Sequence, residues 1–208
     1  AAGRVPVIAG CGSNFTEEAI SLTAHAKEIG ADASLQVTPY YNKPTQPGLY
    51  AHFKAIHDAV DLPMVIYNIP ARSVVDMTVE TMARLAELPN VVGVKDATND
   101  LARPVLAREK IGPEFSQLSG EDGTIGAFLG QGGHGIISVL SNIAPAISVS
   151  MHDAWWAGDI ATFSAVRDRL HPLARALFVE TSPAPVKYAA SLLAICEETV
   201  RLPLVGPT

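Results

Sequence analysis

The sequence predicts an α/β fold in which parallel strands alternate with helices. Short apolar runs rich in β-branched residues alternate with longer stretches of helical period. These runs are apolar almost throughout, as in a parallel sheet whose outer face is covered. They end near Gly10, Thr38, Tyr67, Lys95, Ser119 and Val139, at intervals of 28, 29, 28, 24 and 20 residues. Intervals of this length are typical of strand–helix units joined by right-handed crossovers.

Each apolar run predicts one strand, and each intervening stretch predicts one helix. The expected strands are Val5–Ala9, Ser34–Thr38, Met64–Tyr67, Val91–Val94, Phe115–Ser119 and Gly135–Val139. The expected helices between them are Thr16–Ile29, Gly48–Val60, Thr78–Leu88, Leu101–Ile111 and Asp122–Gln131. Asn14 or Thr16 is expected to cap the first helix, and Asp76–Glu80 resembles a capped first turn.

The strand signal stops after Val139. Three further helices are expected, at Pro145–Trp156, Ile160–Phe178 and Pro183–Cys196, and the last two would form a helical appendage. We therefore expect residues 1–158 to carry the strand–helix units and residues 159–208 to form a C-terminal helical extension. Six units are two short of a closed eight-stranded barrel, whereas an open sheet accepts six. Gly10–Asn14 lacks the full GxGxxG fingerprint, which weakens the open dinucleotide-binding alternative.

Composition excludes several functional classes. A net charge of −6 without a Lys/Arg cluster argues against nucleic-acid binding. No apolar run reaches the roughly 20 residues that cross a bilayer, and no secretory signal is expected at the N-terminus.

Cys11 and Cys196 form no CxxC pair, which favours a reducing cytoplasm. His52 and His57 lack ligand spacing, so we expect no metal. The glycines of Gly130–Gly135 precede a strand and predict a helix-to-strand turn rather than a phosphate cradle.

Lys95 is the sharpest candidate for chemistry. It ends the apolar segment Val91–Lys95, so its ammonium group is expected to be partly desolvated, and desolvation lowers the pKa of an amine. A neutral amine attacks a ketone to form an imine, which then withdraws electrons from the neighbouring carbon. The alternative is a structural lysine paired with Asp96 or Asp122, because ion pairs also perturb lysines. On position alone the two interpretations have about equal weight.

Other reactive side chains lie at neighbouring strand ends, where loops of parallel α/β folds gather active-site residues. Tyr67 has a phenol that can relay a proton, although a strand tyrosine more often packs with a satisfied hydroxyl. Arg72 can grip a carboxylate with its planar fork, or lie solvated in a loop. Tyr40 and Tyr41 follow a strand in a turn, where adjacent aromatics suit a site or an interface.

Four segments together resemble the dihydrodipicolinate synthase / N-acetylneuraminate lyase family. Val92–Thr98 resembles its Schiff-base lysine motif, and Val65–Ser73 is similar to its catalytic tyrosine segment. Thr38–Pro44 and Gly132–Ser138 match two more of its blocks in the right order. The likeness runs along essentially all 208 residues, so it is more specific than any single motif.

The resemblance implies a (β/α)8 TIM barrel with a C-terminal helical extension, usually in a homotetramer built as a dimer of dimers. It implies no external cofactor, because pyruvate would form a covalent imine with Lys95. Tyr67 would be the proton relay, and Tyr41 matches the tyrosine that reaches into the neighbouring subunit's site. Gly120 and Ile137 match positions lining the pyruvate pocket. The residues matching a lysine effector site at the dimer interface are Asn14, Glu18 and Tyr40.

Arg72 separates the branches of this family. It matches the arginine associated with the carboxylate of aspartate semialdehyde, and the Asn-Ile-Pro-Ala-Arg form favours the branch condensing that aldehyde with pyruvate. That reaction gives 4-hydroxy-tetrahydrodipicolinate for diaminopimelate and lysine synthesis. The rival in the same class is a retro-aldolase acting on a sugar keto acid, as in the sialic-acid branch. The rival from another class is an inactive barrel fragment.

The chain departs from the family pattern at both ends. The family's first two strand–helix units, with a Gly-Thr-Thr-Gly loop that binds the pyruvate carboxylate, would precede Ala1. The final helix would follow Pro203. We therefore expect a barrel that lacks its first two units and has two unpaired strand edges, which are a liability for association.

Overall fold

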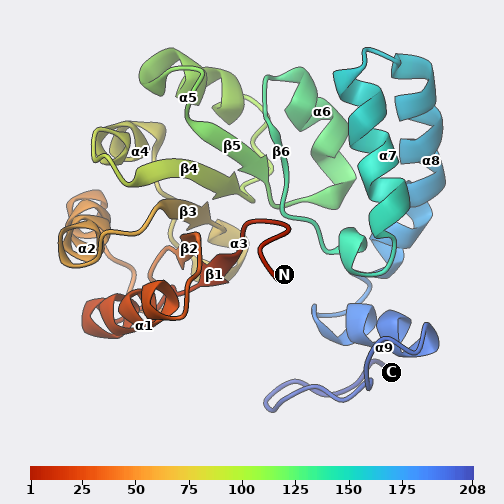
Figure 1. Cartoon of the computed structure of the whole chain (residues 1–208), viewed down its shortest axis with the longest axis horizontal. Coiled ribbons are helices and arrows are strands. Elements are labelled where there is room, and N and C mark those ends of the chain that lie inside the picture. The colour runs from red at the N-terminus through yellow and green to blue at the C-terminus, as the bar shows by residue number, and fades with distance from the viewer. The chain divides into compact units, whose positions relative to one another are not determined.

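The computed structural model describes residues 1–208 and confirms the α/β alternation (Figure 1). The strands are β1 (Ile8–Gly10), β2 (Ala33–Val37), β3 (Met64–Asn68), β4 (Val91–Asp96), β5 (Ser116–Ser119) and β6 (Gly135–Ile136). The helices between them are α1 (Thr16–Glu28), α2 (Gln46–Ala59), α3 (Pro70–Ser73), α4 (Val79–Ala86), α5 (Arg103–Ile111) and α6 (Ile125–Gly130). Three helices follow, α7 (Pro145–Trp156), α8 (Ile160–Ala176) and α9 (Ala184–Leu192). None of these helices is both long and apolar enough to cross a bilayer.

The chain divides into two compact units. The first contains residues 1–120 and 127–134, and the second contains residues 121–126 and 135–208. The boundary predicted between residues 158 and 159 stays a prediction, because this division follows the density of contacts rather than the limits of a barrel.

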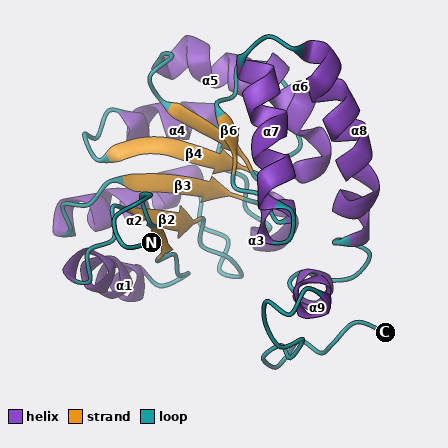
Figure 2. Cartoon of the chain, turned by 45° about the vertical axis from the view of Figure 1, so that its right-hand side comes forward, coloured by secondary structure: helices purple, strands orange, loops and turns teal.

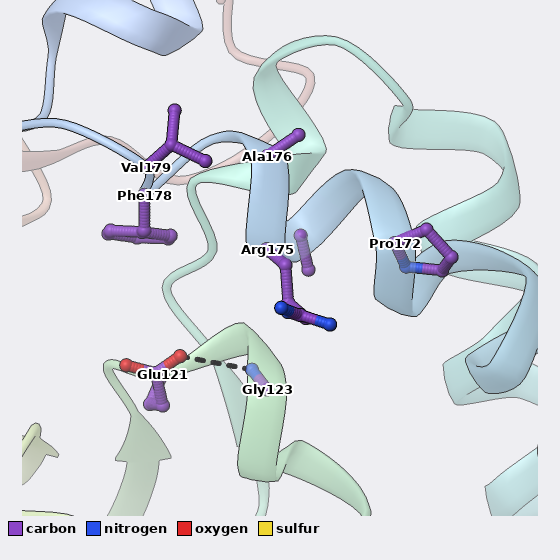
Figure 3. Close-up of a pocket in the computed structure, with 8 residues that line it drawn as sticks. Glu121, Gly123, Pro172, Arg175, Ala176, Phe178 and Val179 are labelled. Carbon is purple, nitrogen blue, oxygen red and sulfur yellow. Dashed lines mark hydrogen bonds between the residues drawn. The ribbon is translucent and has the colours of Figure 1, made fainter.

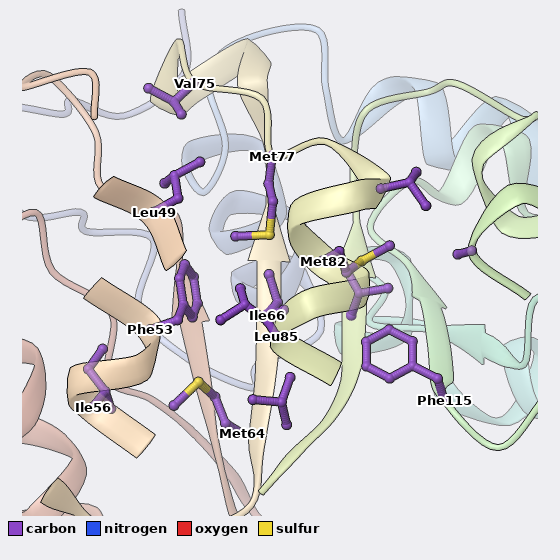
Figure 4. Close-up of a cluster of buried hydrophobic side chains, with 14 of the residues drawn as sticks. Leu49, Phe53, Ile56, Met64, Ile66, Val75, Met77, Met82, Leu85 and Phe115 are labelled. Atoms are coloured by element: carbon purple, nitrogen blue, oxygen red, sulfur yellow. The ribbon is translucent and has the colours of Figure 1, made fainter. Parts of the chain in front are cut away.

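The first unit is a parallel sheet covered by helices. Strands β1 to β5 lie side by side in sequence order, and every neighbouring pair is parallel. Figure 2 shows the strands ending on one side, as parallel strands must. Helices α1, α2, α4 and α5 pack on one face of this sheet, and their apolar stripes enclose the core (Figure 4). The largest core side chains include Phe53, Leu49, Ile66, Met82 and Leu85.

The register of the strands separates two rows of side chains. Gln36, Ile66, Val94 and Gln117 are aligned across β2 to β5 and are buried on the helix-covered face. Successive strand residues point to opposite faces. The next row, Val37, Tyr67, Lys95 and Leu118, therefore faces away from the helices, and all four residues are only half-buried. We call these the helix face and the open face of the sheet.

Several predicted element limits are wrong for local reasons. Strand β1 begins at Ile8 rather than Val5, because the amide of Val7 donates to the side chain of Asp32 at 2.7 Å rather than to the backbone of a neighbouring strand. Strand β6 ends at Ile136 rather than Val139, because the amides of Val139 and Leu140 donate to Asp122 and begin a 3₁₀ turn at Leu140–Asn142. Helix α3 was not predicted at all, although Pro at a first helical position is a known start signal.

The predicted helix caps are right in one case and wrong in the other. Thr78 caps α4 as expected, since its hydroxyl accepts from the amide of Thr81. Neither Asn14 nor Thr16 caps α1, whose cap residue is Phe15 without a side-chain bond. The side-chain Nδ2 of Asn14 donates instead to the backbone carbonyl of Tyr40, 3.2 Å away. A longer-range contact thus replaces the local one.

The glycine-rich segment is a helix-to-strand turn, as predicted. Gly132 has φ of +92°, a conformation that favours glycine, and a Cβ at Gly133 would lie 2.2 Å from the Phe128 ring. His134 follows and bonds reciprocally with the backbone of Gln117. The loop therefore positions the approach to β6.

The second unit is mainly helical. Its helices α7 and α8 pack through an edge-to-face contact between Trp155 and Phe163, whose ring centroids are 5.2 Å apart. A 3₁₀ turn at Asp122–Thr124 precedes α6, so the predicted helix Asp122–Gln131 is interrupted near its start. Asp122 accepts from the hydroxyl of Ser138 and from two backbone amides, which ties this turn to the segment after β6.

Candidate active site

Lys95 and Tyr67 are register partners on the open face of β4 and β3. The Nζ atom of Lys95 lies 4.1 Å from the centroid of the Tyr67 ring. The protonated ammonium form of a lysine at this distance from an aromatic face is attracted by the ring quadrupole. Because the chain folds β3 and β4 as neighbouring parallel strands, two residues 28 positions apart in sequence become direct partners. The structure thus brings together the two residues that sequence analysis ranked first.

The phenol of Tyr67 lies in a partly desolvated setting. Burial raises its pKa above the ordinary value of 10.0, while the positive charge of Arg72 acts in the opposite direction. Burial penalises the charged phenolate, so the neutral form persists to higher pH. A phenol that keeps its proton near neutral pH can donate it to a neighbouring base or oxyanion.

A pocket of about 440 Å³ opens beside Tyr67. Gly10, Gly12, Leu35 and Val37 of the first two strand units are part of its lining, and a Cβ at Gly12 would lie 2.4 Å from the backbone nitrogen of Val37. The lining also includes the polar residues Tyr40, Tyr67, Arg72 and Ser73. A mainly apolar lining with a few polar groups is typical of a small-molecule site.

Helix α3 places Arg72 in the lining of this pocket. Pro70 begins the helix, and Val74 ends it in the left-handed region with φ of 64°. The buried hydroxyl of Ser73 accepts from Thr38 at 3.1 Å and so attaches α3 to the end of β2. An exposed guanidinium in the lining of a pocket can bind a carboxylate.

Gly120 follows β5 and lies against Lys95. A Cβ at Gly120 would be 3.2 Å from Cε of Lys95 and 2.7 Å from Cβ of Ala97. The amide of Gly120 donates to the carbonyl of Asp96 at 2.7 Å. A residue larger than glycine would therefore displace the lysine side chain, which is a physical reason for glycine at this predicted site position.

Tyr41 is not among the residues that line the pocket. It is 87% exposed and has φ of 69°, so the turn projects its ring into solvent. The adjacent Tyr40 is 43% exposed and lines the pocket. Within this chain, the structure therefore brings Tyr40 rather than Tyr41 to the site.

The predicted effector residues lie beside that turn. Asn14 donates to the carbonyl of Tyr40 and accepts at its own carbonyl from Asn42, at 3.2 and 2.8 Å. Glu18, one turn along α1, accepts a hydrogen bond from Ser13. Asn14 is thus directly linked to Tyr40, and Glu18 is exposed nearby in sequence.

The last predicted site residue, Ile137, belongs to the second unit and is half-buried. That unit contains a cavity of about 700 Å³ of its own, lined partly by Glu121, Gly123, Arg175 and Phe178 (Figure 3). Glu121 accepts there from the amide of Gly123 at 3.1 Å. No lysine lines this cavity, and Lys95 is not among the residues that line the pocket beside Tyr67.

The two carboxylates that the sequence offered as structural partners of Lys95 also bind other groups. Asp96 lies on the helix face and accepts from Nε of Arg103 at 2.9 Å and from the hydroxyl of Thr98 at 2.6 Å. Asp122 is bonded to Ser138 and to two backbone amides. This buried pairing of Asp96 with Arg103 was missed from the sequence, because only the tertiary fold brings α5 against the end of β4.

Comparison with known proteins places the whole chain in one context. Residues 1–208 match the Dihydrodipicolinate synthetase family. The chain is 71% identical over 206 residues to 4-hydroxy-tetrahydrodipicolinate synthase of Rhodospirillum centenum, covering 99% of this chain and 71% of that protein. It is similar to the dihydrodipicolinate synthase structure from Aquifex aeolicus, with a TM-score of 0.98, 46% identity, and coverage of 100% of this chain and 71% of the other. It is also similar to the structure of the Acinetobacter baumannii enzyme complexed with pyruvate, with a TM-score of 0.96 and 44% identity. That match covers 100% of this chain and 72% of the other.

Proposed function

Because the chain belongs to the dihydrodipicolinate synthetase family, we propose that it condenses pyruvate with aspartate semialdehyde to give 4-hydroxy-tetrahydrodipicolinate. This product feeds diaminopimelate and lysine synthesis. The observation that carries the proposal is the pairing of Lys95 with Tyr67 on the open face, 4.1 Å from amine to ring centroid. That pairing joins a nucleophilic amine to a proton relay.

The chemistry begins at Lys95. Its neutral amine attacks the ketone carbon of pyruvate, and loss of water leaves an imine between Nζ and that carbon. The imine withdraws electrons, so the methyl group loses a proton and becomes an enamine. The enamine carbon then attacks the aldehyde, and a proton reaches the resulting alkoxide. The amino group that came from the semialdehyde finally attacks the imine carbon and displaces Nζ, which closes the ring of the product and frees Lys95 as the amine. Tyr67 relays these protons, and no external cofactor is required because the imine itself is the electron sink.

Arg72 supports the choice of aldehyde. Its guanidinium borders the same pocket as Tyr67, where it would hold the carboxylate of aspartate semialdehyde. Gly120 leaves room for Lys95 to bear its adduct, and Ile137 would complete the lining of the pyruvate pocket.

The finer architecture follows from the family. The six strands would be units three to eight of a (β/α)8 TIM barrel, with residues 1–158 in the barrel part and residues 159–208 in the helical extension. The parallel sheet with its helix layer supports this assignment. The chain would work as a homo-oligomer, a dimer of dimers in the cytoplasm, in which Tyr41 enters the site of a neighbouring subunit. The 87% exposure of Tyr41 supports such a role.

Regulation by lysine belongs to the same proposal. The side chains that would take part are Asn14, Glu18 and Tyr40, and the first is bonded to the backbone of the third. Glu18 would pair with the amino group of lysine. Titrating lysine against turnover tests this, and Glu18→Gln should abolish any inhibition. Full activity at saturating lysine in the unchanged chain would remove the effector site.

Reductive trapping tests the central step. Borohydride added with pyruvate should reduce the imine to a stable adduct on Lys95, which peptide mass spectrometry would locate. Lys95→Met should eliminate the adduct, whereas Lys43→Met, in an exposed loop, should leave it unchanged. A folded chain that forms no adduct would be an inactive fragment. Arg72→Leu should still form the adduct but lose turnover of the semialdehyde, and unaffected turnover would favour the retro-aldolase.

A further inference from the structure

A buried polar network lies directly behind the reactive pair. In the register of β3 and β4, Tyr67 is aligned with Lys95, and the next residues, Asn68 and Asp96, are aligned with each other. Successive strand residues point to opposite faces, so Asn68 and Asp96 enter the helix face. They are 1% and 8% exposed. Two polar side chains are therefore buried one residue away from the two that carry the chemistry.

Arg103, near the start of α5, connects these strand ends. Its Nε donates to Oδ2 of Asp96 at 2.9 Å, and one of its terminal nitrogens donates to the carbonyl of Met77 at 2.7 Å. Its other terminal nitrogen lies 3.6 Å from Oδ1 of Asp76. Arg103 is 7% exposed, so its charge is held in place by these partners rather than by water.

Asn68 closes the network from the β3 side. Its Nδ2 donates to Oδ1 of Asp76 at 2.7 Å, and its Oδ1 accepts from the amide of Met77 at 3.1 Å. The segment at Asp76 and Met77 is thereby bound by β3 and by Arg103 at once. The members of this network, which we call the β3–β4 clamp, are Asn68, Asp76, Met77 (through its backbone), Asp96 and Arg103.

The clamp also holds the backbone around Lys95. The carbonyl of Asn68 accepts from the amide of Ala97 at 2.9 Å, and the carbonyl of Asp96 accepts from the amide of Gly120 at 2.7 Å. Gly120 is the residue whose small size accommodates Cε of Lys95. None of the four clamp side chains lines the pocket beside Tyr67, and these backbone hydrogen bonds connect the clamp to the residues around Lys95.

From this geometry we infer that the β3–β4 clamp sets the position of Lys95 relative to Tyr67, with Arg103 as its central positioning residue. The inference rests on the proposed function for its catalytic consequence. A buried ion pair is not needed simply to stabilise a core, because apolar replacements often do so equally well. Its directional bonds, however, fix the ends of two strands to within the tolerance that a reaction between bound groups requires.

The experiment compares clamp variants with a control on the same helix. Arg103→Met breaks the clamp at its centre, and Asp76→Ala removes only its half-exposed acceptor, so this second variant should stay folded. Arg108→Met is the control, because Arg108 also lies on α5 and also donates to a carbonyl, that of Gly132. The rate of pyruvate trapping on Lys95 is measured per folded molecule across pH. Acetic anhydride labelling of Lys95 across pH gives a second readout that is independent of pyruvate.

We expect trapping to fall about 100-fold in Arg103→Met and about tenfold in Asp76→Ala, as for a reacting group displaced by roughly 1 Å. The pH midpoint of Lys95 labelling should move in both variants and stay unchanged in Arg108→Met. Asp76→Asn, which keeps an acceptor oxygen for Asn68, should recover most of the loss.

Unchanged trapping per folded molecule and unchanged labelling in both clamp variants would overturn the inference, since a purely stabilising network alters only the folded fraction. If the unchanged chain forms no adduct, the proposed function fails. In that case the pH midpoint of Lys95 labelling alone tests the inference about the clamp. A shift of the midpoint in the clamp variants supports the inference, and an unchanged midpoint overturns it.

Discussion

The two faces of the sheet each carry a basic side chain, and these two side chains differ in their partners and in their burial. On the helix face, Arg103 is bound by Asp96 and the carbonyl of Met77 and is almost fully buried. On the open face, Lys95 lies against the ring of Tyr67 and is only half-buried. Directional bonds to a carboxylate fix the position of a guanidinium, whereas an aromatic ring attracts an ammonium group over its whole face. The comparison indicates that the bonds that fix the strand ends lie on the helix face, whereas the reactive side chains lie on the open face.

The largest effect is expected from breaking the helix face. Arg103→Met leaves the carboxylate of Asp96 buried without its charge partner, so the free energy of unfolding should fall by about 3–5 kcal/mol. The double variant Arg103→Met with Asp96→Leu removes both charges and should recover most of this loss. Urea unfolding measures both values. A double variant as unstable as the single one would show that the charge pair is not what holds this face.

The open face should respond in activity instead. Tyr67→Phe keeps the ring beside Lys95 but removes the hydroxyl, so adduct formation should survive while condensation falls about 100-fold. Parallel measurements of trapping and of turnover with aspartate semialdehyde separate the two steps. Tyr50→Phe is the matched control, because the Tyr50 ring also lies under a cation, Arg84, at 4.2 Å. Equal loss in both variants would remove the relay role of Tyr67.

The helix layer should also carry a pH dependence of stability. Burial lowers the pKa of His52 on α2 from 6.5 to about 4, with Thr16 on its Nδ1 at 3.0 Å and no partner on its Nε2. The unfolded chain takes up the proton first as the pH falls below 6.5. The contribution of His52 to the free energy of unfolding is therefore fully present at pH 7 and is lost as the pH falls towards 4. The loss at pH 5 should be roughly 2 kcal/mol.

Replacing this histidine should flatten that dependence. His52→Gln should lose less unfolding free energy between pH 7 and pH 5 than the unchanged chain does. His25→Gln, at an exposed position of α1, should keep the full decline. Urea midpoints at both pH values give the comparison, and an undiminished decline in His52→Gln would place the acid sensitivity elsewhere.

The smallest effect is expected at Gly120, directly after β5. Gly120→Ala would place a methyl group 2.7 Å from Cβ of Ala97 and 3.2 Å from Cε of Lys95, so trapping should fall about tenfold through displacement of the lysine. Gly206→Ala, where a Cβ meets nothing within 4 Å, should have no effect. Wild-type trapping in Gly120→Ala would mean that Lys95 tolerates movement of its neighbours.

The sequence alone determined the alternation of strands and helices, because an apolar run in a covered parallel strand differs in length and period from an amphipathic helix. It also placed Lys95 and Tyr67 at strand ends, where parallel topology gathers them. Their identification as a reactive pair came from family motifs, since strand-end position alone weighed equally for a structural lysine.

Only the tertiary structure decided which partners the polar side chains take. Asp96 pairs with Arg103 across seven positions, Asn68 with Asp76 across eight, and Asn14 leaves its helix end for the carbonyl of Tyr40. Local pattern predicts a strand or a helix because each depends on neighbouring residues. A hydrogen-bond partner depends on which elements meet in space, so the clamp, the short helix α3 and the exposed Tyr41 become evident only in the folded chain.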